Sequence, residues 1–212
     1  MNNESESSAQ CADGRREERR QRIVDVARTH FLQHGYAGTS MSGLLKPLGG
    51  SKTTIWAYFP TKQELFAAVI EDLTASFKAE LEDALSLTGS LELGLAQFCR
   101  TMILKLGMSE MVATWRLVVA ESGRFPEVGR TFYDRAAKHT HTALANYLRR
   151  YVDNGELTAN DTSEMANTLI SFCASQQNKI LWSIEPERTV YSDVEADVGR
   201  TVNAFFAMYR VK

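Results

Sequence analysis

Residues 39–66 read TSMSGLLKPLGGSKTTIWAYFPTKQELF, and this stretch decides the fold. Its first part places apolar side chains at helical spacing, at Met41, Leu44, Leu45 and Leu48. Thr39 or Ser40 can cap the start of this helix, and the pair Gly49-Gly50 ends it. Pro47 lies inside the helix and lacks the N–H that would bond to Gly43, at a typical cost of about 3 kcal/mol. We therefore expect this helix to be short or kinked.

A second helix follows directly. Ser51 can cap its start, and it runs to about Phe59, because Pro60 disfavours the helical conformation in the residue before it. Residues 61–64 read TKQE, a capping-box pattern that opens a longer third helix. Apolar residues spaced by four extend this third helix to about Leu85.

Two short helices joined by a glycine turn predict a helix-turn-helix, which places its second helix in the major groove of DNA. On that helix Ile55 and Phe59 are four residues apart and can face inward. The opposite face is small and polar with one aromatic side chain, and consists of Thr53, Thr54, Ala57 and Tyr58. An ordinary helical hairpin with a solvated face has the same spacing, so spacing alone leaves both interpretations open.

Charge is distributed unevenly along the chain. Residues 15–62 hold nine Lys and Arg against three Asp and Glu, whereas residues 63–212 hold 15 against 20. A basic module joined to an acidic one is typical of a protein whose first part meets phosphates. The basic module opens with five arginines, which suit phosphate contact or a solvated first turn paired with Glu17 and Glu18. Residues 1–14 are polar and acidic and are expected to be a disordered tail.

Residues 51–66 resemble the DNA-binding signature of the tetracycline-repressor (TetR) family. The preceding part resembles it too, at Ala27, Phe31, the His34-Gly35-Tyr36 corner and Thr39-Ser40. The resemblance covers residues 22–66. It implies an all-α homodimeric transcriptional regulator of about nine helices, usually a repressor that a small ligand releases. Residues 15–66 would then form a three-helix DNA-binding domain, and residues 67–212 a helical ligand-binding and dimerisation domain.

The resemblance implies DNA contacts at ten positions, which are Thr39, Ser40, Ser51, Lys52, Thr53, Thr54, Trp56, Ala57, Tyr58 and Lys62. Hydroxyl groups and the Ala57 methyl group suit base edges. Trp56 and Tyr58 would contact the sugar-phosphate backbone, with hydrophobic packing as the alternative for Trp56, and Lys62 would hold a phosphate. Three positions depart from the family pattern, since Thr53 replaces a glycine or alanine, Gly50 replaces a β-branched residue, and Pro47 lies inside the first helix of the motif.

Further helices are expected at about 91–106, 110–123, 126–154, 161–182 and 192–209, with no strand. The last two carry apolar stripes formed by Ala166, Leu169, Ile170 and Cys173, and by Val198, Val202, Phe205, Phe206 and Tyr209. Such stripes usually pack inside one chain. The resemblance implies instead that these two helices pair with their symmetry mates, and a two-fold dimer would bind a palindromic operator.

Candidate effector-binding side chains in the C-terminal part are Phe98, Met102, Met108, Met111, Trp115, Phe132, Asn178 and Trp182. Methionine and aromatic residues also fill cores, so this pattern has a purely structural alternative. Residues 115–126 resemble a subgroup associated with efflux or with aromatic and lipophilic compounds. Within this segment we expect Arg116 to pair with Glu121 rather than with an acidic ligand.

Several function classes find no support in the sequence. It has no Ser-His-Asp order, glycine-rich phosphate loop or metal-ligand spacing, so we expect neither an enzyme nor a cofactor. Three widely spaced cysteines indicate free thiols in a reducing cytoplasm. No apolar run reaches 18 residues, so no membrane span is expected. The alternative function is an architectural DNA-binding protein without a ligand, which a filled C-terminal core would favour.

Overall fold

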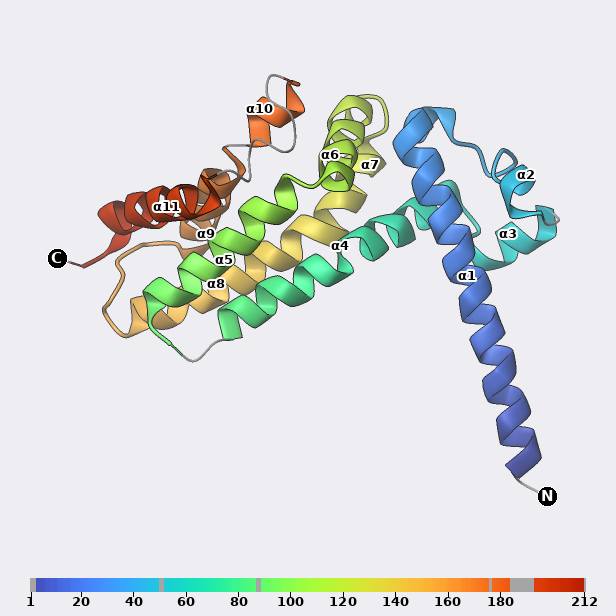
Figure 1. Cartoon of the computed structure of the whole chain (residues 1–212), viewed down its shortest axis with the longest axis horizontal. Helices are drawn as coiled ribbons and strands as arrows, with labels where there is room; N and C mark the ends of the chain where they lie inside the picture. Colours follow the sequence, from blue (N-terminus) through green and yellow to red (C-terminus); the bar gives the residue numbers. More distant parts are fainter. Residues whose placement is uncertain (1–2, 50–51, 87–88, 176, 184–192, 212) are drawn as a thin grey trace.

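The computed structural model describes residues 3–49, 52–86, 89–175, 177–183 and 193–211. Over these ranges the chain is helical, and the one extended feature is an isolated bridge between Leu157 and Arg210. The all-α prediction is therefore confirmed. In Figure 1 the first three helices form one end of the molecule, and α4 runs from them into the remaining helices.

The N-terminal part consists of α1 (Asn3–Gly38), α2 (Leu45–Leu48), α3 (Lys52–Tyr58) and the start of α4 (Lys62–Ser86). Helix α1 begins at Asn3, where a disordered tail over residues 1–14 was expected. Residues 3–14 contain no proline and a single glycine, whose helical cost is only about 1 kcal/mol, so the helix can extend backwards. Near its other end α1 is interrupted at Gly35, whose φ of 74° suits glycine.

Helix α2 is only four residues long, and Pro47 explains where it begins. Leu44 is its N-cap, so Pro47 falls in the first turn, where an N–H would have no partner within the helix. The short helix thus avoids the cost that Pro47 would have in a longer one. Gly49 ends α2 in the left-handed conformation, with φ 61°, and its N–H bonds to the carbonyl of Leu45.

The C-terminal part contains α5 (Leu91–Leu106), α6 (Ser109–Ser122), α7 (Pro126–Phe132), a π-helical turn η1 (Tyr133–Ala137), α8 (Lys138–Asp153), α9 (Thr162–Ala174), α10 (Gln177–Leu181) and α11 (Val194–Tyr209). The helix expected at 126–154 is present but contains the π-turn η1. The helix expected at 161–182 is two helices, α9 and α10. These divisions raise the count in the described residues above the nine helices predicted.

The buried side chains form two main hydrophobic cores, and α4 contributes to both. The N-terminal core joins α1–α3 to the first half of α4, through residues such as Phe31, Leu44, Ile55, Leu65 and Phe66. The C-terminal core joins the second half of α4 to α5, α8, α9 and α11, through residues such as Phe77, Leu81, Phe98, Leu144, Leu169 and Phe205. Helices α6 and α7 complete the N-terminal core with Leu117, Val118 and Val128. The packing therefore continues across the domain boundary predicted at residue 66.

The contact between α5 and α8 at Gly94 provides a test of the C-terminal core. A methyl group at Gly94 would lie 2.1 Å from Oη and 2.9 Å from Cζ of Tyr147, a buried side chain. We expect Gly94→Ala to lower the free energy of unfolding by about 1–3 kcal/mol, because the added methyl group would overpack the core. Chemical denaturation measures this. The loss should be smaller in a Tyr147→Phe background, which lacks the nearest atom.

Gly14→Ala is the matched control, since no atom lies within 4 Å of a methyl group at that helical position. It should leave the free energy of unfolding unchanged or slightly higher. Equal effects of the two glycine substitutions would contradict the packing described here.

Candidate nucleic-acid interface and apolar pocket

Helix α3 presents one face to the N-terminal core and the other to solvent. Ile55 and Phe59 are buried, as the spacing predicts. Trp56 is 37% exposed and Ala57 is exposed, while Thr54 and Tyr58 are half-buried. The outer face is therefore the one that the sequence assigns to DNA. Lys52 and Thr53 lie at the start of α3, where only the backbone is described, and Ser51 lies outside the described residues.

The two hydroxyl groups before α2 have different environments. Thr39 is 1% exposed and its Oγ1 donates to the carbonyl of Gly35 at 2.9 Å, so this hydroxyl group serves the end of α1. Ser40 is exposed, and its Oγ accepts a hydrogen bond from the N–H of Gly43 at 3.0 Å. Of the two candidates for a phosphate contact, Ser40 is the one at the surface.

Lys62, the first residue of α4, ties that helix to the end of α1. Its Nζ donates to the carbonyls of Tyr36 at 2.9 Å and Thr39 at 3.2 Å, and lies 4.1 Å from the centre of the Tyr36 ring. Burial lowers the pKa of Lys62, against the opposing effect of Glu121 and Glu127. An ammonium group has three N–H donors, so these two carbonyls leave one for an outside acceptor. The phosphate contact at Lys62 stays a prediction.

The corner between α6 and α7 packs against the same end of α1. The ring of Phe125 lies 5.4 Å from that of Tyr36, edge to face. Glu121 accepts a hydrogen bond from the N–H of Ala37 at 3.0 Å. Burial, with a smaller effect of Glu127, raises the pKa of Tyr36 to about 12. The C-terminal part thus contacts the end of α1 directly, as well as through α4.

These contacts correct the expected pairing of Arg116 with Glu121. Arg116 donates instead to the carbonyls of Ile180 at 2.6 Å and Leu181 at 3.2 Å, at the end of α10. Five residues on a helix span about 500°, so Arg116 and Glu121 point to different sides of α6. Arg116 thus donates to the last two carbonyls of α10, of which that of Ile180 also accepts from the N–H of Ser183 at 2.9 Å.

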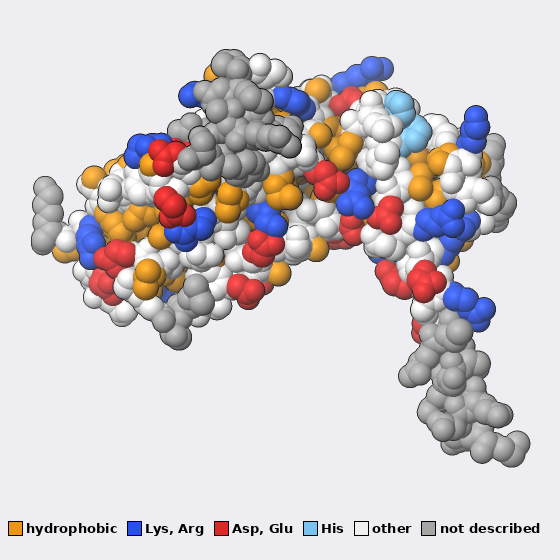
Figure 2. Space-filling model, viewed as in Figure 1, with side chains coloured by type: hydrophobic (Ala, Val, Ile, Leu, Met, Phe, Trp, Pro, Cys, Tyr) orange, Lys and Arg blue, Asp and Glu red, His pale blue; other side chains and the backbone are white. Residues whose placement is uncertain are grey.

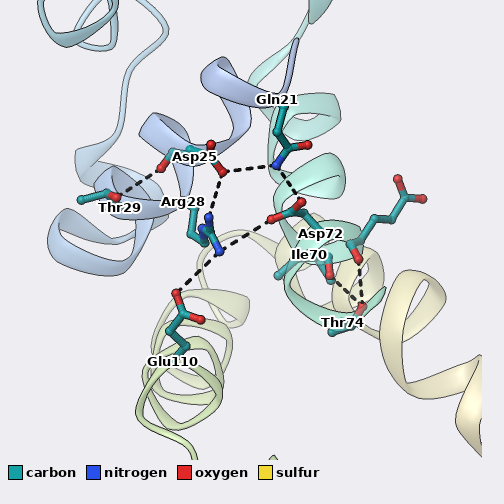
Figure 3. Close-up of polar contacts among 9 residues, drawn as sticks. Gln21, Asp25, Arg28, Thr29, Ile70, Asp72, Thr74 and Glu110 are labelled. Carbon is teal, nitrogen blue, oxygen red and sulfur yellow. Dashed lines mark hydrogen bonds and ion pairs between the residues drawn. The ribbon is translucent and has the colours of Figure 1, made fainter. Parts of the chain in front are cut away.

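A polar cluster joins α1, α4 and α6 farther along α1 (Figure 3). Arg28 bonds to Asp25 at 2.8 Å, and lies 3.7 Å from Asp72 of α4 and 3.7 Å from Glu110 of α6. Gln21 donates to Asp72 at 2.8 Å. One arginine of the N-terminal part therefore faces both helices that lead into the C-terminal part.

A pocket of about 310 Å³ lies in the C-terminal part, between α4, α5, α6, the end of α7, the turn η1, α8 and α9. Its apolar lining is Phe77, Met102, Leu106, Met111, Trp115, Phe132, Ala136, Ala137, Ile170 and Ala174. The Trp115 and Phe132 rings meet edge to face at 5.2 Å. The more polar lining residues are Thr74, Lys78, Tyr133, Thr140, His141 and Asn167, and the lining contains no Asp or Glu.

The pocket brings together four of the sequence candidates, namely Met102, Met111, Trp115 and Phe132. Phe98 is fully buried in the C-terminal core, outside this lining. Trp182 is 67% exposed, and Asn178 and Met108 are also at the surface. The lining residues from α4, η1, α8 and α9 are not among the effector-binding candidates from the sequence. For Phe77 the sequence does contain a signal, because this residue belongs to the apolar face, spaced by four residues, of the helix predicted to reach Leu85.

The nine residues of the two predicted stripes divide by burial, and Ala166 is fully buried. Leu169, Cys173, Val198, Val202 and Phe205 are buried in the chain's own C-terminal core, whereas Ile170, Phe206 and Tyr209 are half-buried beside it. The buried side chains are therefore covered within the chain itself, and a dimer contact through α9 and α11 stays a prediction. The outer faces of the two helices carry Ser171 on α9, and Ala204, Ala207 and Met208 on α11, whereas the exposed Asn167 of α9 lines the pocket. Figure 2 shows hydrophobic side chains exposed between charged ones over the C-terminal helices.

Other candidate chemistry is limited in the described ranges. No group of three or more His, Cys, Asp and Glu side chains there is arranged to hold a metal ion. None of the helices described is long and apolar enough to cross a membrane. Cys99 and Cys173 are buried free thiols, and their mutual hydrogen bond, with burial, raises the pKa of Cys173 well above its usual range.

Comparison with known proteins gives two family matches. Residues 23–69 match the bacterial regulatory proteins of the tetR family, and residues 93–211 match the C-terminal domain of AefR-like transcriptional repressors. The uncharacterized HTH-type regulator YezE of Bacillus subtilis is 25% identical over 173 residues, which cover 80% of this chain and 84% of YezE.

Two solved structures are similar over most of their length. The flavonoid-responsive regulator FrrA has a TM-score of 0.80 at 27% identity, covering 92% of this chain and 99% of its own. A structure assigned to a TetR-family regulator of Mesorhizobium loti MAFF303099 has a TM-score of 0.76 at 25% identity, covering 92% and 98%. The chain is a transcriptional regulator of the tetR family.

Proposed function

We propose that this regulator is a repressor that binds a palindromic operator as a homodimer and is released by a small lipophilic or aromatic effector. The observation that carries this proposal is the course of α4. The helix begins at Lys62, beside the DNA-binding helices, and lines the pocket with Phe77 and Lys78. A molecule that displaces α4 at the pocket therefore also displaces the end that holds α1.

DNA would be read by the outer face of α3. Trp56 and Ala57 project from this face, and the hydroxyl residues Thr53 and Thr54 precede them on the same helix. A methyl group and hydroxyl groups fit base edges in the major groove, and an exposed indole can pack on the sugar-phosphate backbone. Ser40 before α2 adds an exposed hydroxyl group at the same end of the molecule.

Two such interfaces are needed for a palindrome, and the outer faces of α9 and α11 supply a surface for pairing. Ala204, Ala207 and Met208 form a small apolar stripe at helical spacing. Small side chains allow close approach of two helices, so this stripe fits a helix of a second copy. The pair would carry two α3 helices about one DNA turn apart, near 35 Å.

The pocket is the place for the effector. Its volume of about 310 Å³ and its mostly apolar walls are typical of small-molecule sites. The resemblance to a flavonoid-responsive regulator supports a planar aromatic molecule as the effector class. A hundredfold loss of operator affinity requires the effector to bind the DNA-free form better by about 2.7 kcal/mol, which a few buried apolar contacts can supply. The cavity argues against the architectural alternative, for which a filled core is expected.

A substitution at Lys62 tests two roles of this side chain separately, one in stabilising the fold and one in contacting a DNA phosphate. Lys62→Ala removes the donor from two carbonyls, so we expect the free energy of unfolding without DNA to fall by about 1–2 kcal/mol. If Lys62 also holds a phosphate, affinity should fall alike for all DNA sequences, and the slope of log K against log salt should decrease by about one. Denaturation and salt titrations measure the two effects separately.

Lys46→Ala is the control for stability, since Lys46 is an exposed lysine of α2. It should leave unfolding unchanged. Wild-type stability in Lys62→Ala would contradict the role at the end of α1, and a wild-type salt slope would contradict the phosphate contact.

The dimer surface is tested at Ala207. Because an arginine there would bring two charges into a close helix contact, we expect Ala207→Arg to give a monomer at micromolar concentration. Sedimentation velocity measures this, and operator binding should weaken with it. Ser76→Arg adds the same charge to an exposed position of α4 and should leave a dimer. A dimer in both variants would rule out this surface, and a monomeric wild-type chain on DNA would rule out the dimer.

A further inference from the structure

Lys78 places a positive charge in the lining of the mostly apolar pocket, and this charge affects which molecules the pocket can bind. Lys78 is half-buried on α4, next to Phe77, which also lines the pocket. Its Nζ donates to the backbone carbonyl of Arg135. A carbonyl group accepts this hydrogen bond but leaves the positive charge of the ammonium group unbalanced.

Three glutamates of α4, the helix that carries Lys78, pair with other basic groups. On α4, Glu71 pairs with Arg135 at 2.5 Å, Glu80 with Lys105 at 2.6 Å and Glu82 with His139 at 2.5 Å. No Asp or Glu is among the residues that line the pocket. Within the described part of the chain, the apolar pocket therefore has a cation and no carboxylate to balance it.

Other polar groups in the lining are compatible with an anion. His141 is not one of them through Nε2, because that nitrogen donates its hydrogen to the carbonyl of Ser163 at 3.0 Å. Thr140 and Asn167 add a hydroxyl group and an amide to the lining. The apolar part of the pocket includes an aromatic wall formed by Trp115 and Phe132.

From this arrangement we infer that the effector is an amphipathic acid. Its flat or hydrophobic body occupies the aromatic part of the pocket, and a single carboxylate, sulfonate or ionised phenol pairs with Lys78. This inference rests on the proposed function and specifies the ligand of the same pocket. A charged acceptor makes a stronger hydrogen bond than a carbonyl, so the ligand competes with Arg135 for the ammonium group. Binding would thereby break the hydrogen bond from Lys78 of α4 to the π-turn η1, while the ion pair between Glu71 and Arg135 still joins the two elements.

Two fluorescent probes with one ring skeleton test this directly. 8-Anilinonaphthalene-1-sulfonate carries a sulfonate group, and N-phenyl-1-naphthylamine is the same skeleton without it. We expect Lys78→Met to weaken binding of the sulfonate about tenfold and to change binding of the neutral probe less than twofold. Lys78→Arg should keep the sulfonate affinity within about threefold of wild type, because it retains the charge.

Two controls separate the possible failures. Lys138→Met removes an exposed lysine outside the pocket lining and should change neither affinity. Ala137→Trp fills the pocket from η1 and should abolish binding of both probes, with thermal melting used to verify folding. The inference is overturned if Lys78→Met leaves the sulfonate affinity within twofold, or if it weakens both probes equally. Undiminished binding of both probes to folded Ala137→Trp would instead remove the pocket as the effector site, and the inference with it.

Discussion

Helix α4 contributes buried side chains to both hydrophobic cores, and the rest of the structure depends on this packing. Leu65 and Phe66 are buried with α1–α3, and Leu81 and Leu85 are buried with α5 and the later helices. A helix of 25 residues rises about 1.5 Å per residue and stays stiff between two such anchors. Neither core can move α4 alone, because packed interiors transmit displacement instead of absorbing it. The two parts of the protein are therefore mechanically coupled by ordinary core packing.

A second connection runs through α6 and α7. Leu117 and Val118 complete the N-terminal core, and Glu121 and Phe125 hold the end of α1 where Lys62 also binds. The DNA-binding helices thus rest on α4 from one direction and on the α6–α7 corner from another. The pocket touches both supports, since Phe77 of α4 and Trp115 of α6 are in its lining. This arrangement gives an occupant of the pocket two routes to α1.

The sequence predicted the N-terminal part well because its signals are local. Glycine and proline end α2 and α3 near the expected positions, and the apolar face of α4 is apparent from spacing alone. Long-range contacts carry no such signal. The pairing of Arg116 depends on where α10 ends, and the bonds of Lys62 depend on the path of the chain after Gly35. The π-turn η1 interrupts a helix whose residues, from Tyr133 to Ala137, show no proline or glycine to announce it.

The same limit applies to the candidate sites. Trp115 and Phe132 were selected because large aromatic side chains suit a pocket, and they meet in one. Phe98 and Trp182 met the same criterion, but one is in the core and the other at the surface. Composition cannot distinguish these three environments, since all of them accept an aromatic side chain. The apolar stripe of α11 likewise contains the buried Phe205 and the half-buried Phe206, and only the packing distinguishes the two.

The central claim is that occupation of the pocket and binding of DNA compete through α4. The most direct test is the operator affinity of the wild-type protein with and without saturating 8-anilinonaphthalene-1-sulfonate, on an operator selected in vitro from random DNA. The account predicts that the bound probe lowers operator affinity at least tenfold, and that it has no effect on Ala137→Trp, whose pocket is filled. Unchanged operator affinity while the probe saturates the pocket would contradict the account.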